Sequence, residues 1–110
     1  KMAQDFESTF QTDIMTGSFT TLLNSDSDDA VIGLRFVNKH SGSVTVDAKI
    51  VSASVSYHVI KEAPVPAGGS LELIDGGSKV VIQSGSILSA RTSKTGSVDT
   101  IVSYIDTISE

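Results

Sequence analysis

The sequence predicts an all-β protein, folded as a single antiparallel β-sandwich of about eight strands. The β-branched residues Val, Ile and Thr are abundant, and they favour strands over helices. Apolar and polar residues alternate in short runs, and clusters of Gly, Pro, Asn, Asp or Ser separate these runs at roughly the 8–12-residue spacing of sandwiches and barrels. A length of 110 residues is that of one domain. We therefore expect an Ig-like or jelly-roll-like sandwich.

Residues 1–17 are expected to form an N-terminal arm or edge strand, and residues 18–110 the sandwich domain. Phe6, Phe10 and Ile14 fit one face of a helix, but they also share one face of a strand, and the weak helix formers between them favour the extended form. Two interpretations follow. Either the Phe rings close one end of the core, the more common fate of Phe, or they are exposed and contact a partner together with Ile14.

The first half of the sandwich contains three expected strands. The first is Phe19–Leu23, which an acidic turn separates from Val31–Val37. The third strand, which runs from Val44 to Ile50, shows the cleanest alternation of the chain. This alternation is typical of a half-buried strand. The residues expected on buried faces are Ile32, Leu34 and Phe36 in the second strand and Val44, Val46, Ala48 and Ile50 in the third, with Arg35, Thr45, Asp47 and Lys49 on the opposite faces.

The central stretch begins with a strand in which Val55, Tyr57 and Val59 alternate with Ser56, His58 and Ile60, as suits a strand with one buried face. Pro64 and Pro66 lack the backbone donor that a sheet requires, so this strand must end there or lie at an edge. A strand around Leu71 and Leu73 follows. Asp75-Gly76-Gly77 then predicts a hairpin turn, with Lys79–Ile82 as the returning strand.

Two further strands complete the expected fold. Gln83-Ser84-Gly85 predicts a turn before the strand Ser86–Thr92, and Ser93–Gly96 predicts a hairpin loop. The last strand, Val98–Ile105, is apolar on both faces. One face carries Val98, Val102 and Tyr104, and the other carries Ile101 and Ile105.

Composition disfavours several classes of function. The net charge of −5 and the pI of about 4.8 disfavour nucleic acids and anionic membrane surfaces. The chain has no cysteine, so neither a disulfide framework nor a thiolate zinc site is expected. Its first residues lack the apolar core of a signal peptide, and we expect a protein that is made and used without the general secretion route. Aromatic residues make up 5%, few for a stacking site.

The acidic turn is the best candidate for a metal site, yet it fits poorly. Asn24, Asp26 and Asp28 occupy the first three alternating ligand positions of a helix–loop–helix calcium loop. However, position six is Asp29 instead of Gly, and position twelve is Arg35 instead of Glu. A solvated turn is therefore favoured, and we predict no metal and no cofactor.

No catalytic constellation is visible. His40 and His58 are expected on the surface, and the nucleophile elbow G-x-S-x-G is absent. Glu62 and Glu72 lie near turns without the aromatic platform of a sugar-cleaving site. We predict that the protein is not an enzyme. Six basic residues are expected as scattered solvated positions, namely Lys39, Lys49, Lys61, Lys79, Arg91 and Lys94.

Several segments together resemble small virion structural proteins of tailed phages, including marine cyanobacterial phages. The matching segments are VIGLRFVN, SGSVTVDAKI, YHVIKEAPVPAGGSLELIDGGSKVVIQSGSIL and GSVDTIVSYID. They span roughly residues 30–106, and Ala63–Leu71 and Val98–Ser103 carry the likeness best. The resemblance implies a β-sandwich component of the particle without catalysis, and it transfers no functional residue.

We therefore predict a capsid decoration protein, also called a cement protein, that stabilises a shell through protein–protein contacts. Its expected partners are other virion proteins, foremost the major capsid protein, and a homo-oligomer is expected, with a trimer favoured. The alternative is a neck, tail or fibre accessory protein, including a module that binds host-surface carbohydrate. That alternative needs Tyr57 or Tyr104 exposed on a concave face, whereas the valines beside both residues favour burial.

Overall fold

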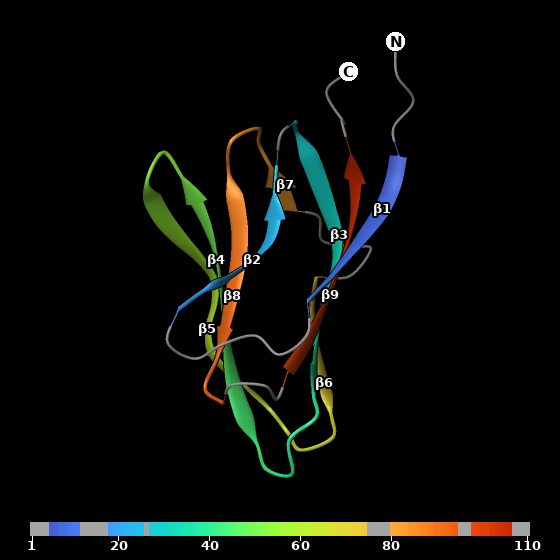
Figure 1. Ribbon diagram of the computed structural model, residues 1–110, viewed down its shortest axis with the longest axis vertical. Coiled ribbons are helices and arrows are strands. Elements are labelled where there is room, and N and C mark those ends of the chain that lie inside the picture. The colour runs from blue at the N-terminus through green and yellow to red at the C-terminus, as the bar shows by residue number, and fades with distance from the viewer. Residues whose placement is uncertain (1–4, 12–17, 26, 75–79, 95–97, 107–110) are drawn as a thin grey trace.

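The computed structural model describes residues 5–11, 18–25, 27–74, 80–94 and 98–106, and these ranges form an all-β sandwich (Figure 1). The prediction of the fold class is confirmed. The described residues contain nine strands. In chain order they are β1 (Asp5–Gln11), β2 (Thr20–Asn24), β3 (Asp29–Asn38), β4 (Val44–Ser52), β5 (Val55–Val65), β6 (Ser70–Ile74), β7 (Val80–Ile82), β8 (Ile87–Thr92) and β9 (Val98–Asp106).

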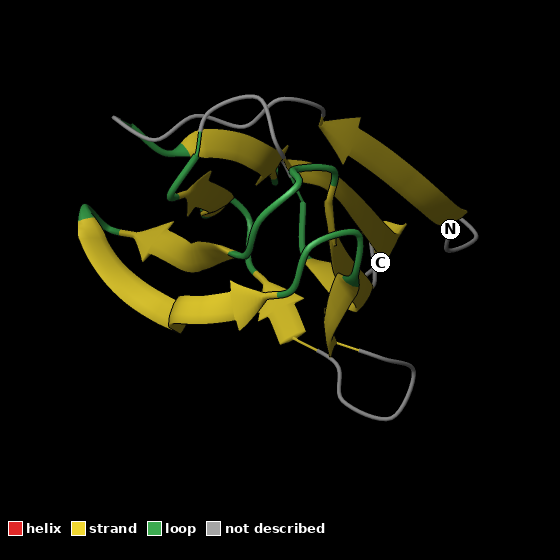
Figure 2. Cartoon of the chain, turned by 90° about the horizontal axis from the view of Figure 1, so that it is seen from below, coloured by secondary structure: helices red, strands yellow, loops and turns green. Residues whose placement is uncertain are grey.

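The strands form two antiparallel sheets. The five-stranded sheet has the order β1-β9-β3-β6, with β7 also paired to β3, and the four-stranded sheet has the order β2-β8-β4-β5. Figure 2 views the sheets from below and shows β1, beside the N label, at the periphery of the molecule. The division of the chain into an arm of residues 1–17 and a domain of residues 18–110 stays a prediction, with β1 forming an edge strand.

The core lies between the sheets and is aliphatic apart from one ring, Phe36, which is fully buried. Each inner face supplies alternate residues, as the pleat of a half-buried strand requires. The largest buried apolar residues are Leu34, Phe36, Ile82, Leu88, Val31, Val46, Val65, Val98 and Val102. The last strand behaves as predicted, since Val98 and Val102 are buried and Tyr104 packs against the core.

A bulge changes which residues of β3 enter the core. Val31 pairs with Tyr104 and Gly33 pairs with Ser103, so Ile32 is the extra residue on β3. The buried positions are therefore Val31, Leu34 and Phe36, while Ile32 is only half-buried. The prediction that Ile32 shares the buried face with Leu34 and Phe36 was wrong, because a bulge shifts the alternation by one residue.

The strand Val80–Ile82 does not return along β6. Val37 pairs with Ser70 and Leu34 with Ile74 in β6, whereas Val31 pairs with Val80 in β7. Both strands thus run antiparallel to β3, one after the other. The predicted Asp75-Gly76-Gly77 turn lies outside the described residues. The predicted strand is present as β7, but the prediction that it pairs with β6 in a hairpin is wrong, because β3 is long enough to pair with both segments.

The predicted hairpin loop Ser93–Gly96 joins two different sheets. It follows β8 in the four-stranded sheet and precedes β9 in the five-stranded sheet, so it is not a hairpin. Residues 95–97 lie outside the described ranges. The partner of β9 is β3 on one side and β1 on the other, which makes this connection a crossover at one end of the sandwich.

The true hairpin joins β4 and β5. Ser52 pairs with Val55, which leaves a two-residue turn. Its residues, Ala53 and Ser54, have φ values of 52° and 66°, as a type I′ turn requires. The usual Asn-Gly signal is absent, so the sequence pattern did not reveal this turn. β5 runs on through Pro64 to Val65 as an edge strand, the position at which a sheet tolerates proline.

Candidate docking surface

The strand β1 presents its aromatic side chains to solvent. Phe6 is 75% exposed and Phe10 is 67% exposed. The interpretation that these rings close one end of the core was therefore wrong for the described residues. The third predicted contact residue, Ile14, lies outside those residues. Large exposed apolar side chains on one strand make this face a candidate docking surface.

The exposed rings belong to a larger apolar face, because residues opposite one another in antiparallel strands share one face. Phe6 lies beside Ile105 of β9, which lies beside Ala30 of β3, which lies beside Val81 of β7. Phe10 likewise lies beside Ile101. We call this the apolar outer face, made of Phe6, Phe10, Val81, Ile101 and Ile105 around Ala30, which is itself only 4% exposed.

A shallow hollow interrupts the apolar outer face. Between the two rows lie three small residues, Ser8, Ser103 and Gly33. The hollow has a volume of about 230 Å³ and is lined by Gly33, Leu34, Arg35, Glu72, Ile101 and Ser103. Arg35 and Glu72 form an exposed ion pair of 2.8 Å at its rim. The face is therefore apolar towards β1 and polar towards β6.

The sequence already carried a signal for this face. Val98–Ile105 is apolar on both sides, a pattern typical of strands that are covered on both faces. The structure covers one side with the four-stranded sheet, while Ile101 and Ile105 lie half-buried on the other side. The contribution of Ala30 and Val81 could not be read from the sequence, because it depends on the pairing of β7 with β3.

The opposite side of β1 is polar. Glu7 accepts a hydrogen bond of 3.2 Å from the hydroxyl of Tyr104. Burial, followed by this hydrogen bond and the charge of Glu7, raises the pKa of Tyr104 to about 12. Glu7 therefore anchors β1 to β9, while the aromatic side of β1 faces outward.

A second hollow lies beside the tip of the β4–β5 hairpin, which stands on the left of Figure 1. It has a volume of about 360 Å³ and is lined by Ile50, Ser52, Tyr57, Val81, Gln83 and Ser86. Tyr57 shares a face with Ile50 yet is 58% exposed. The prediction that Tyr57 is buried was wrong, because Tyr57 lies on β5, the edge strand of the four-stranded sheet, and no described strand pairs with the other side of β5.

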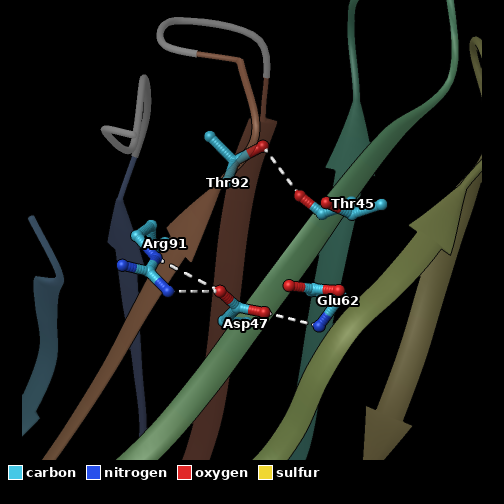
Figure 3. Close-up of polar contacts among 5 residues, drawn as sticks. All are labelled: Thr45, Asp47, Glu62, Arg91 and Thr92. Carbon is cyan, nitrogen blue, oxygen red and sulfur yellow. Dashed lines mark hydrogen bonds and ion pairs between the residues drawn. The ribbon is translucent and has the colours of Figure 1, made fainter. Parts of the chain in front are cut away.

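A polar cluster fixes the centre of the four-stranded sheet (Figure 3). Lys61 and Glu62 of β5 together oppose Asp47 of β4, so β5 bulges there. The carboxylate of Asp47 accepts the N–H of Glu62 and two bonds, of 2.9 and 3.1 Å, from Arg91. Burial alone would raise the pKa of Asp47, but the Glu62 N–H and the Arg91 guanidinium outweigh it and lower that pKa.

Phe19 covers the outer side of the same sheet. The Nζ atom of Lys49 lies 3.9 Å from the centre of the Phe19 ring, and the Cζ atom of Arg91 lies 4.5 Å from it. His58 meets the ring edge-on, with the ring centres 6.4 Å apart. Such cation–π contacts orient both cations. Lys49, Arg91 and also Lys39, which pairs with Asp99 at 3.0 Å, therefore have partners, while the side chains of Lys39 and Arg91 are solvated as predicted, at 42% and 37% exposed.

The acidic turn is tied into the fold. Asp29 belongs to β3, is 2% exposed and accepts the hydroxyl of Ser25 at 2.7 Å. The hydroxyl of Ser27 lies 3.0 Å from a carboxylate oxygen of Asp29 and 3.0 Å from one of Asp106, and its single proton is shared between these two acceptors. Asp28 accepts the N–H of Ser84 at 2.9 Å. The prediction of a solvated turn was wrong for Asp29, because its buried carboxylate accepts hydrogen bonds from neighbouring hydroxyls. Asp26 lies outside the described residues.

The candidate catalytic residues are not brought together. His40 lies in the turn after β3, where its N–H donates to Asn38 at 2.8 Å, whereas His58 lies on β5. Within the described ranges no group of three or more His, Cys, Asp or Glu side chains could hold a metal ion. Those ranges also lack any helix with the length and hydropathy needed to cross a bilayer.

Comparisons with known proteins give a likeness of fold. No known protein family and no curated protein sequence matches the chain. A chain in the structure of infectious bursal disease virus, Gx strain, has a similar fold, with a TM-score of 0.53 and 11% sequence identity. The match covers 99% of the present chain and 34% of the viral chain. The present chain thus spans about one third of the viral chain's length and shares its fold.

Proposed function

We propose that the protein is a structural component of a virus particle and acts through protein–protein contacts. The observation that carries this proposal is the apolar outer face, which the described part of the chain leaves uncovered on one side of the sandwich. The fold shared with a chain of a virus structure supports a viral structural role. The phage-like segments in the sequence support a tailed phage as the source, and decoration of the capsid as the particular role.

The expected partner is another virion protein, foremost the major capsid protein. We propose that Phe6 and Phe10 make this contact. Ile14, the third residue of the proposed N-terminal arm, is expected to contribute as well. The acidic surface of a chain with net charge −5 complements a basic patch on such a partner. Since aromatic residues dominate the energetics of interfaces, loss of both rings is expected to abolish attachment.

Particles from an infected lysate, purified on a density gradient and probed with an antibody against the chain, test this proposal. We expect the chain to sediment with the particles in a fixed ratio to the major capsid protein. The double variant F6S/F10S, supplied during infection, is expected to stay in the soluble fraction. Recovery of the unmodified chain in the soluble fraction alone would refute the proposal, and full attachment of the double variant would refute the role of the two rings.

A second candidate function is a carbohydrate-binding module on a tail, neck or fibre. The observation that favours it is Tyr57, whose exposed ring lines a hollow next to the polar groups of Ser52 and Gln83. An aromatic face beside hydroxyl and amide groups suits a sugar ring. Binding on a glycan array that the Tyr57→Ala variant loses would support this candidate, and an array without any hit would count against it.

A further inference from the structure

β1 is the outermost strand of the five-stranded sheet, and no other described strand pairs with its outer edge. Among the described strands, β9 is the one that pairs with β1, along all seven residues and without a register shift. Exposed edges are commonly protected by charged side chains, especially Lys, by Pro or by a bulge. The charged residues of β1 are Asp5 and Glu7, and the Glu7 carboxylate is engaged by the Tyr104 hydroxyl. β1, with the sequence DFESTFQ, contains neither Lys nor Pro, and its pairing shows no bulge. Its other edge is therefore competent to pair with a further strand.

The sequence of β1 is self-complementary when two copies run antiparallel. A two-fold axis perpendicular to the sheet must pass midway between the two copies of one residue, because only then do opposing residues share a face. With the axis at Ser8, all seven residues pair. Phe6 then lies opposite Phe10 of the second copy, in both halves of the pair. Asp5 and Glu7 each fall opposite an uncharged residue.

Other registers lose these features. An axis at Glu7 places two glutamates opposite each other, and like charges in that position are destabilising. An axis at Thr9 places Phe10 opposite Ser8 of the second copy and leaves Phe6 without an opposing residue within β1. The Ser8 register therefore combines full overlap, aromatic pairs and the avoidance of like charges.

We infer that two copies of this chain associate by antiparallel pairing of β1 with β1, centred on Ser8. The two five-stranded sheets become one continuous sheet, and the four Phe rings form two facing Phe6–Phe10 pairs on its outer face, one on each side of the Ser8 pair. This inference uses the same strand as the proposed function and names a second copy as its partner. It rests on the proposed function only for its place in a particle, because pairing of the purified chain needs no other virion protein.

The absence of native cysteine allows a direct test of the register. In an antiparallel pair, residues directly opposite have Cα atoms about 4.5–5.5 Å apart, within the range that a disulfide bridges. Under mild oxidation the full-length Ser8→Cys variant is expected to form a covalent dimer of twice 11.5 kDa. The matched control is Ser103→Cys, placed beside Ser8 but one strand inward, which is expected to stay monomeric on a non-reducing gel.

A mixed experiment and a mass measurement complete the test. Glu7→Cys mixed with Thr9→Cys is expected to give a covalent heterodimer, whereas Glu7→Cys alone is not. Light scattering after size exclusion is expected to give a dimer for the unmodified chain. The Ser8→Lys variant, which places like charges at the axis, is expected to raise the dissociation constant about fivefold. Circular dichroism checks that each variant is folded.

Three results would overturn the inference. They are a monomer at all concentrations, a trimer unaffected by Ser8→Lys, and cross-linking of the Ser103→Cys control as fast as that of the Ser8→Cys variant. None of them touches the proposed function, because a chain that does not pair with itself can still bind another virion protein through the apolar outer face. Conversely, a dimer in solution whose chain is missing from purified particles would retain the pairing and refute the proposed function.

Discussion

Replacement of Asp47 by Ala is expected to destabilise the protein by about 2–4 kcal/mol. The carboxylate has a side-chain exposure of 10% and accepts the N–H of Glu62, which lies in the bulge of β5. A hydrogen bond to a charged group contributes about 1.5–3 kcal/mol. The Arg91 side chain is 37% exposed, so its ion pair adds only about 0–1 kcal/mol.

Urea denaturation at neutral pH, followed by circular dichroism, measures this loss. The Asp47→Asn variant keeps an acceptor for Glu62 but loses the charge, and we expect it to lie between Asp47→Ala and the unmodified chain. The matched control is Glu72→Ala, which breaks the exposed ion pair with Arg35 and is expected to cost less than about 1 kcal/mol. Equal effects of Asp47→Ala and Glu72→Ala would refute the reasoning.

The same carboxylate predicts a dependence of stability on pH. The pKa of Asp47 in the folded state lies below its ordinary value of 3.8, so the unfolded chain binds a proton at a higher pH than the folded chain does. The contribution of Asp47 is therefore present above about pH 4 and is lost as the pH falls through the folded-state pKa. A series of denaturation curves from pH 6 to pH 2 tests this sign. A slope in the Asp47→Asn variant as steep as in the unmodified chain would contradict it.

Three further predictions concern the fold. Replacing Ala53-Ser54 by Asn-Gly is expected to stabilise the protein by about 1–2 kcal/mol, because both positions have positive φ; an unchanged urea midpoint would contradict this. Thr100→Val is expected to stabilise by about 1 kcal/mol, because within the described residues the buried Thr100 hydroxyl lacks a hydrogen-bond partner; a loss of stability would count against it. Spectrophotometric titration of the Tyr57→Phe variant is expected to give a pKa of about 12 for Tyr104. Because the unfolded chain loses this proton at a lower pH, the stability of the fold is expected to fall as the pH rises from about 10 towards 12. The Glu7→Gln substitution is expected to lower the pKa of Tyr104.

The sequence was sufficient for the fold class because alternation is a local property. Val44, Val46 and Ala48 follow the predicted pattern and are buried. The errors arose where pairing between distant segments decides the outcome. The bulge at Ile32 depends on the register with β9, and the course of β7 depends on the free length of β3. Asp47 was predicted to lie on an exposed face. It is buried beside the β-bulge of the neighbouring strand β5.

The candidate site was only partly accessible to the same reasoning. Phe6 and Phe10 could be named from their shared face, but their exposure depends on which side of β1 faces the second sheet. The hydrogen bond between Tyr104 and Glu7 shows which side of β1 faces the second sheet. These two residues are 97 positions apart in the chain. The apolar outer face needs the additional register of β9 with β1 and β3, which no local pattern specifies.

The central claim, that the aromatic side of β1 is covered in the assembled particle, is tested most directly by hydrogen exchange of residues 5–11. Amide exchange is compared by mass spectrometry between the chain in solution at concentrations where it is monomeric and the chain on purified particles. We predict that exchange in residues 5–11 slows on the particle, while exchange in residues 50–57, beside the Tyr57 hollow, is unchanged. Equal exchange of residues 5–11 in both samples, or slowing confined to residues 50–57, would contradict the claim.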